Sequence, residues 1–144
     1  MESRAWIDVD LDAVRHNFTA VRRLAGPDRA VIAVVKADAY GLGAERVVRA
    51  LEPLDPWGYG VAAVAEGTAL RAYGVRRPIL LTAPAPPQCI EEAAAARLTL
   101  SVSDLHTLDL WARAAERRGE PLDFHVEIDT GMGRAGFDWR TTAD

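Results

Sequence analysis

Cysteine is almost missing from this sequence: Cys89 is the only one among 144 residues. A single cysteine excludes an intrachain disulfide and a zinc site built from several cysteines, and it fits a reducing compartment. Apolar runs of membrane length, about 20 residues, are also missing, and no apolar run follows a basic start at the N-terminus. These absences predict a cytoplasmic protein with no membrane span and no signal peptide.

Clustered positive charge is missing too. Lys and Arg number 17 against 21 Asp and Glu, which gives a net charge of -4. Non-specific nucleic-acid binding needs a basic surface, so no nucleic-acid partner is expected. His16, His106 and His125 have no helical metal-ligand spacing, so no metal site is expected, and Cys89 is interpreted as a small packed residue.

What the sequence does contain is the composition of one folded domain, with 49% hydrophobic and 26% charged residues. Segments typical of strands alternate with segments typical of helices. Strands are predicted at 4–9, 30–35, 59–64, 78–83, 98–103 and 122–129, and helices at 11–26, 44–54, 65–75, 85–97 and 104–119. Asp10 and Asp104 are predicted to cap the first and last of these helices.

The alternation indicates an α/β fold with parallel strands and right-handed crossovers. The run AVIAVV at 30–35 is continuously apolar and rich in β-branched residues, so it is predicted to be buried on both faces. Two architectures suit the pattern: an open doubly wound sheet complete at this length, or part of a (β/α)8 barrel, which takes about 250 residues. Both place the chemistry at the carboxyl ends of the strands.

Lys36 directly follows the apolar run and alternates onto the face of Ile32 and Val34. Burial on such a face disfavours the charged ammonium and favours the neutral amine that a Schiff base with an aldehyde requires. The alternative is a lysine that extends from the strand end to water, and position alone favours this alternative.

The segment KADAYGLG at 36–43 is predicted to be a loop of small residues with one aromatic. Gly41 and Gly43 allow close approach of the backbone to a ligand. Tyr40 can donate to a phosphate, although a packed loop aromatic is the alternative, and the helix starting near Ala44 is expected to offer free N–H groups to an anion.

The predicted strand at 122–129 carries Glu127 and Asp129 on one face near its end. If that face points into the mouth of a barrel, the two carboxylates need a cation such as Arg134, because unpaired buried carboxylates are costly. The alternative is an edge strand with a solvated polar face, and without further motifs this alternative is favoured.

Two motifs carry a resemblance to a known family. VVKADAYGLG at 34–43 is similar to the cofactor-lysine motif of alanine racemase, and EIDTGMGRAGF at 127–137 is similar to the DTGMGR-G segment of that family. AWIDVDLDAVRHNFTAVR at the N-terminus resembles the opening strand and helix of the family, and YGVAAVAEGTALR resembles its second barrel unit. The resemblance covers nearly the whole chain, in the order and spacing of the family.

The resemblance implies a (β/α)8 TIM barrel followed by a β-rich C-terminal domain, with this chain forming an incomplete barrel of about five βα units. It implies racemisation of L- and D-alanine with pyridoxal 5'-phosphate, by two-base exchange of the α-proton, to supply D-alanine for cell-wall peptidoglycan. Lys36 would hold the cofactor covalently and act as the base for the D-enantiomer. Tyr40 would bind the phosphate, and Arg134 would place the substrate carboxylate and the phenolic side of the cofactor.

Two positions depart from the family pattern. Many members have a carbamate-modified lysine where this chain has Glu127, so Glu127 is expected to supply the carboxylate itself and to pair with Arg134. Leu42 stands where histidine is common and is expected to change packing only. The second base, a tyrosine contributed across a homodimer, and the arginine at the pyridine nitrogen lie later in the family than residue 144.

Residues 1–144 are therefore expected to be the N-terminal part of the barrel domain of a longer enzyme, inactive alone. Exposed strand edges and apolar faces predict self-association or marginal stability of the isolated chain. Two alternatives stay open: a racemase for serine or another amino acid, and a non-catalytic α/β module that retains pyridoxal phosphate.

Overall fold

Five parallel strands form the main sheet of the computed structural model, which describes residues 5–141. The strands are β1 (Ile32–Val34), β2 (Gly58–Val61), β3 (Ile79–Leu81), β4 (Thr99–Val102) and β5 (Phe124–Val126). A separate small sheet pairs β6 (Ile128–Asp129) with β7 (Phe137–Asp138). Because every pair in the main sheet is parallel, the carboxyl ends of its strands meet at one edge.

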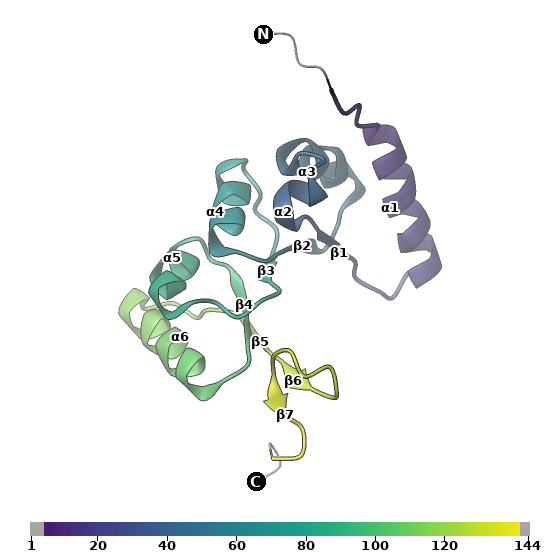
Figure 1. Ribbon diagram of the computed structural model, residues 1–144. Helices are drawn as coiled ribbons and strands as arrows, with labels where there is room; N and C mark the ends of the chain where they lie inside the picture. The colour runs from purple at the N-terminus through teal and green to yellow at the C-terminus, as the bar shows by residue number, and fades with distance from the viewer. Residues whose placement is uncertain (1–4, 142–144) are drawn as a thin grey trace.

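The connections between the strands are helical. The α-helices are α1 (Leu11–Ala25), α2 (Lys36–Tyr40), α3 (Ala44–Leu51), α4 (Val64–Ala72), α5 (Ile90–Ala95) and α6 (Leu105–Arg118), and the 3-10 turns are η1 (Glu52–Leu54) and η2 (Pro87–Cys89). Figure 1 shows α3, α4, α5 and α6 following one another along the same side of the strands. The predicted alternation of strands and helices is therefore confirmed from residue 11 onward.

Both predicted helix caps are confirmed. The Asp10 carboxylate accepts hydrogen bonds from the N–H groups of Asp12 and Ala13 at the start of α1, at 2.9 and 3.0 Å. The Asp104 carboxylate accepts from the N–H of Thr107 at 2.7 Å at the start of α6. These bonds satisfy N–H groups that have no partner inside the helix.

The main sheet keeps its strands in chain order, β1-β2-β3-β4-β5. A doubly wound sheet reverses its strand order at a switch point, and none of the described strands does so. A steady progression with helices along one side is how a (β/α)8 barrel is built. The expected barrel-type fold with about five βα units is confirmed, and the open doubly wound alternative is wrong.

The helices bury one face of the sheet almost completely. The side chains of Tyr59, Val61, Ile79, Leu81 and Leu100 are at most 1% exposed. At about 25 cal/mol per Å² of buried apolar surface, such side chains each stabilise the fold by about 2 kcal/mol. This buried layer between the helices and the sheet holds the strands in place. It therefore also positions the residues that follow the carboxyl end of each strand.

The opposite face of β1 is open, so the prediction that 30–35 is buried on both faces is wrong. Val34 is 44% exposed, and Ile32 is half-buried. Both side chains lie next to Gly60 of the neighbouring strand. Gly60 adds no side chain to this face, and α3 to α6 lie along the other side of the strands (Figure 1).

The strand predicted at 4–9 is not found: residues 5–10 have no regular structure, and Arg4 lies outside the described residues. Trp6 and Ile7 are each 77% exposed. A strand needs a neighbour to pair its N–H and C=O groups. Within the described residues β1 pairs only with β2, so residues 5–10 do not add a strand to the main sheet.

The strand predicted at 122–129 is divided at Glu127 into β5 and β6. The backbone of Glu127 bonds to two different sheets, because its N–H donates to Val102 of β4 and its C=O accepts from Phe137 of β7, at 2.9 and 2.8 Å. The chain leaves the main sheet at this residue and enters the small one.

Arg71 of α4 ties together the segments that lead into β3 and β4. Its guanidinium is half-buried and donates to four backbone carbonyl groups: Ala96 at 2.8 Å, Val75 at 3.0 Å, Arg77 at 2.7 Å and Arg97 at 2.8 Å. Few other side chains could replace it, because the planar guanidinium carries five donors in a fixed geometry.

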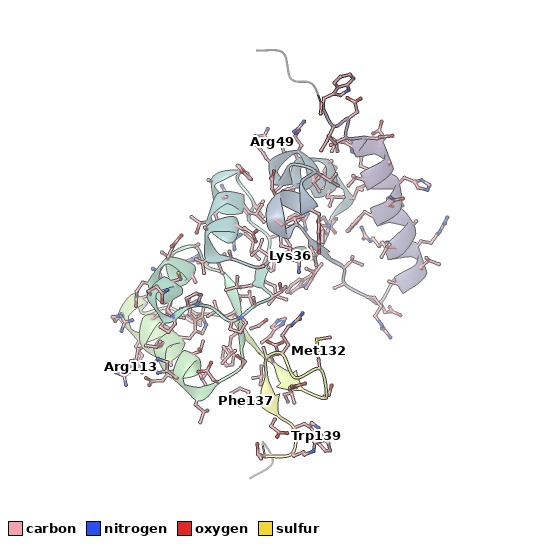
Figure 2. The ribbon with its side chains drawn as sticks, in the orientation of Figure 1. Lys36, Arg49, Arg113, Met132, Phe137 and Trp139 are labelled. Carbon is pink, nitrogen blue, oxygen red and sulfur yellow. The ribbon has the colours of Figure 1, made fainter. Side chains whose placement is uncertain are left out.

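We expect Arg71→Ala to lower the free energy of unfolding by about 2–4 kcal/mol, because several carbonyl groups lose their donors at once. The matched control is Arg113→Ala on α6 (Figure 2), whose exposed guanidinium pairs with Asp109 at 2.9 Å. The control is expected to change stability by less than about 0.5 kcal/mol. Urea denaturation measures both, and equal losses in the two variants would contradict the role of Arg71.

Candidate functional site

Lys36 lies half-buried at the carboxyl end of β1, as the first residue of α2. It is the only lysine in the sequence, since the other 16 of the 17 Lys and Arg residues are arginine. Arginine stays protonated in proteins and cannot offer a neutral amine. The one residue of this chain that can form a Schiff base through its side chain therefore stands at the edge where this fold carries its chemistry.

Residues 37–40 form a single left-handed turn, with φ angles of 50° at Ala37, 54° at Asp38, 54° at Ala39 and 57° at Tyr40. Non-glycine residues in this conformation cost about 1–2 kcal/mol each. The prediction of a loop at 36–43 is therefore wrong at residues 36–40, which form the short helical turn α2. A strained turn of this kind persists only where its surroundings hold it.

Backbone hydrogen bonds hold part of the turn. The N–H of Ala39 donates to Val35, the N–H of Gly41 to Ala37 and the N–H of Gly43 to Asp38, each at 2.9 Å. Gly41 has φ of 85°, so glycine ends the turn without the strain that a side chain would add.

The turn brings Tyr40 back beside Lys36. The Nζ atom of Lys36 lies 6.0 Å from the centroid of the Tyr40 ring. The Tyr40 side chain is 64% exposed, so its hydroxyl is accessible to a ligand. In Figure 2, Lys36 and Met132 lie on the same side of the strands.

Asp38 occupies the start of α3. Its carboxylate accepts a hydrogen bond from the N–H of Ala44 at 2.6 Å. The prediction that this helix start offers free N–H groups to an anion is wrong at Ala44, because a negative side chain already lies there.

Glu66 of α4 links the turn to the next βα unit, although no motif in the sequence pointed to it. Its carboxylate accepts from the N–H of Ala37 at 2.7 Å, and from those of Ala62 and Ala63 at 2.8 and 3.2 Å. Burial would raise the pKa of Glu66, but these three donors and the nearby Lys36 charge lower it below its usual range. The available signal was a glutamate at the third position of a helix, where it can reach back to the helix start.

Asp129 forms its own loop after β6. Its carboxylate accepts from the N–H of Gly131 at 2.8 Å. Backbone donors, first Gly133 and then Gly131, lower the pKa of Asp129. A side chain at Gly136 would meet the backbone of Asp129 at 2.6 Å, which explains glycine there. The expectation that Asp129 needs Arg134 as a partner is wrong.

Glu127 and Arg134 are not joined by an ion pair within residues 5–141. The Oε2 atom of Glu127 is buried and has no hydrogen-bond partner among the described residues. Arg134 is exposed. An unsatisfied buried carboxylate oxygen costs about 1–3 kcal/mol or more, so this atom is open to a cationic donor. The pairing of Glu127 with Arg134 stays a prediction.

Metal ligands do not gather in the described part of the chain. No group of three or more His, Cys, Asp or Glu side chains there could hold a metal ion. Among residues 5–141, no helix has the length and apolar character to cross a membrane.

The side chains at the carboxyl edge fit pyridoxal phosphate, the cofactor implied by the sequence motifs. Lys36 offers an amine for an aldehyde, Tyr40 offers an accessible phenol for a phosphate, and Arg134 offers an exposed guanidinium for an anionic oxygen. No phosphate donor comes from Ala44, whose N–H is taken by Asp38.

Comparisons with known proteins give one consistent result. A family model described as "Alanine racemase, N-terminal domain" matches residues 9–144. An alanine racemase of Desulforamulus reducens is 37% identical over 95% of this chain and 37% of its own length. The solved alanine racemase of Clostridium difficile 630 superposes with a TM-score of 0.86 at 37% identity, covering 89% of this chain and 34% of that one.

A solved histidine racemase from Leuconostoc mesenteroides is also similar, with a TM-score of 0.79 and 26% identity over 89% of this chain and 34% of that one. The chain thus spans little more than one third of the length of the proteins it resembles.

We expect Ala37→Gly to stabilise the protein slightly, by up to about 1 kcal/mol. Glycine removes the strain of the left-handed turn, about 1–2 kcal/mol, and the greater freedom of the unfolded chain offsets part of this gain. The matched control is Ala65→Gly, an exposed alanine in the right-handed helix α4, where the same change costs about 1 kcal/mol. Thermal denaturation measures the change in stability of each variant: a gain is expected for Ala37→Gly and a loss for Ala65→Gly. A similar loss of stability in both variants would rule out a left-handed turn at Ala37.

Proposed function

The chain belongs to the alanine racemase family, and on that premise we propose that the protein racemises L- and D-alanine with pyridoxal phosphate. Residues 1–144 are the N-terminal part of its barrel domain, and a β-rich domain follows in the full-length protein. The one observation that carries the proposal is the position of Lys36, the only lysine of this chain, at the carboxyl end of β1 with Tyr40 beside it.

Lys36 would hold the cofactor through its amine. Once the substrate amine has displaced it, the freed Lys36 amine would be the base that removes or returns the α-proton on one face of the substrate, the one serving D-alanine. When bound, pyridoxal phosphate supplies an electron sink for the negative charge left on the α-carbon. The contribution of the protein is then to orient the substrate and to place the bases.

Tyr40 and Arg134 bind anionic groups. The exposed Tyr40 side chain, whose ring centroid lies 6.0 Å from the Nζ atom of Lys36, would donate its hydroxyl to the phosphate, while the Lys36 amine would hold the other end of the cofactor. Arg134 binds the substrate carboxylate and the phenolic oxygen, where a planar guanidinium can donate twice.

Glu127 orients Arg134. The buried Oε2 atom of Glu127 lacks a partner among the described residues, and a guanidinium is the donor that such an atom favours. This carboxylate is encoded in the sequence, so its presence does not depend on carbon dioxide.

The second base, a tyrosine, comes from the C-terminal domain of a partner subunit, so the active enzyme is a homodimer and the 144-residue chain alone is inactive. The enzyme works in the cytoplasm and supplies D-alanine for cell-wall peptidoglycan. A second candidate function is racemisation of another amino acid, which the similarity to a histidine racemase supports. Rates measured across L-alanine, L-serine and L-histidine separate the two.

The test of the function uses the full-length protein loaded with pyridoxal phosphate and reduced with borohydride. Peptide mass mapping is expected to find the cofactor on Lys36, and Lys36→Arg is expected to lower alanine racemisation by about 100- to 10,000-fold. The control combines Lys36→Arg with Arg49→Lys, which moves the amine to an exposed position on α3 (Figure 2). Labelling of the moved lysine to the wild-type extent, or full activity of Lys36→Arg, would refute the assignment.

A second test concerns Glu127. We expect Glu127→Ala to lower kcat/KM by up to about 100-fold, because Arg134 loses the group that orients it. In Glu127→Lys, added bicarbonate is expected to restore part of the activity, because a carbamate on the new lysine replaces the carboxylate. Wild-type activity should not respond to bicarbonate. An alanine variant as active as wild type would remove Glu127 from the site.

A further inference from the structure

One carboxylate joins the ends of two neighbouring strands. The Oε1 atom of Glu66 accepts a hydrogen bond from the N–H of Ala37, just after β1 and Lys36, at 2.7 Å. Its Oε2 atom accepts from the N–H groups of Ala62 and Ala63, just after β2, at 2.8 and 3.2 Å. Glu66 therefore bridges the segments that follow the two strands, at the edge that carries Lys36.

Only an ionised glutamate meets this geometry fully. Both of its oxygens face N–H donors, and an ionised carboxylate accepts on both sides. A glutamine would point its own NH₂ group either at the N–H of Ala37 or at those of Ala62 and Ala63, which breaks the bond or bonds on that side and adds a repulsive contact. An aspartate is shorter by one methylene group and cannot span the same two segments.

The surroundings of Glu66 favour its charged form, and the charge strengthens its hydrogen bonds. Three backbone donors and the nearby Lys36 favour the ionised form, against the effect of its partial burial. Hydrogen bonds to an ionised acceptor are roughly twice as strong as neutral ones. The bond to Ala37 is thus one of the stronger links between the turn and the rest of the protein.

Ala37 is the residue at which the left-handed turn begins. Its φ of 50° follows directly on Lys36, and the next three residues continue the turn up to Tyr40. The backbone bonds inside the turn close it on itself, and the N–H of Val35, which donates to Gly60 of β2 at 2.8 Å, holds the residue before Lys36 against that strand. The bond from Ala37 to Glu66 adds a link from the first peptide of the turn itself, and it restrains the direction in which both Lys36 and Tyr40 leave the backbone.

We propose that Glu66 is a positioning residue for the cofactor site: by holding the Ala37 peptide against the end of β2, it aims the Lys36 amine and the Tyr40 hydroxyl at the same bound molecule. The proposal rests on the function proposed above for its consequence in catalysis. Its structural part, the bond to Ala37, is independent of that function.

The first experiment measures hydrogen–deuterium exchange in the cofactor-free full-length protein. In Glu66→Gln and Glu66→Ala, amides in the peptide covering residues 36–43 are expected to exchange about tenfold faster than in wild type. The matched control is Glu91→Gln, which also changes a glutamate in the first turn of a helix and lies in an exposed pair with Arg117. Exchange of 36–43 within about twofold of wild type in the Glu66 variants would overturn the proposal.

The second experiment measures the loaded enzyme. We expect Glu66→Gln to lower kcat by about tenfold with a nearly unchanged KM for alanine, and to alter the visible circular dichroism of the bound cofactor, which reports its orientation. A role in stability alone would lower the melting temperature and leave the dichroism per bound cofactor unchanged, and that result would also overturn the proposal.

The two proposals fail separately. If wild-type protein binds no pyridoxal phosphate at Lys36, the proposed function is wrong, whereas the exchange measurement still decides the role of Glu66 in holding the turn. If wild type is active and the Glu66 variants match it in exchange, dichroism and kcat, the function stands and the positioning role is wrong.

Discussion

The left-handed turn at residues 37–40 is the constraint on which the rest of the site depends. Four non-glycine residues in this conformation are costly, so the turn has to be held by its surroundings. Glu66 accepts from its first residue, Ala37, and ties it to the end of β2, and the side chain of its second residue, Asp38, ties it to α3. As a result, the side chains of Lys36 and Tyr40 lie close to each other in a fixed geometry.

The two ends of the strands have different tasks in this fold. Before the strands, Arg71 donates hydrogen bonds to carbonyl groups of the segments that lead into β3 and β4. After the strands, Glu66 accepts hydrogen bonds from N–H groups of the segments that follow β1 and β2. Two side chains of α4 therefore act at opposite ends of the strands: Arg71 stabilises the amino ends, and Glu66 stabilises the carboxyl ends, where the site lies. In barrel enzymes generally, the amino ends serve stability and the carboxyl ends carry the active site.

Local patterns predicted the elements well and the site less well. The caps Asp10 and Asp104 were predictable because an N-cap bond spans only two or three residues. The left-handed turn was not, because alanine and tyrosine have no local preference for it and one aspartate does not predict four such residues in a row. Glu66 was missed for a related reason: its decisive bond joins residues 29 positions apart, and its signal in sequence is that of an ordinary helix start.

The central claim is that Lys36 holds pyridoxal phosphate from a left-handed turn that also presents Tyr40. A crystal structure of the full-length protein with the cofactor tests it most directly. The account predicts continuous electron density from the Nζ atom of Lys36 to the cofactor, the Tyr40 hydroxyl within hydrogen-bond distance of the phosphate, and positive φ angles at residues 37–40. A cofactor bound away from Lys36, or an extended or right-handed backbone after Lys36, would contradict it.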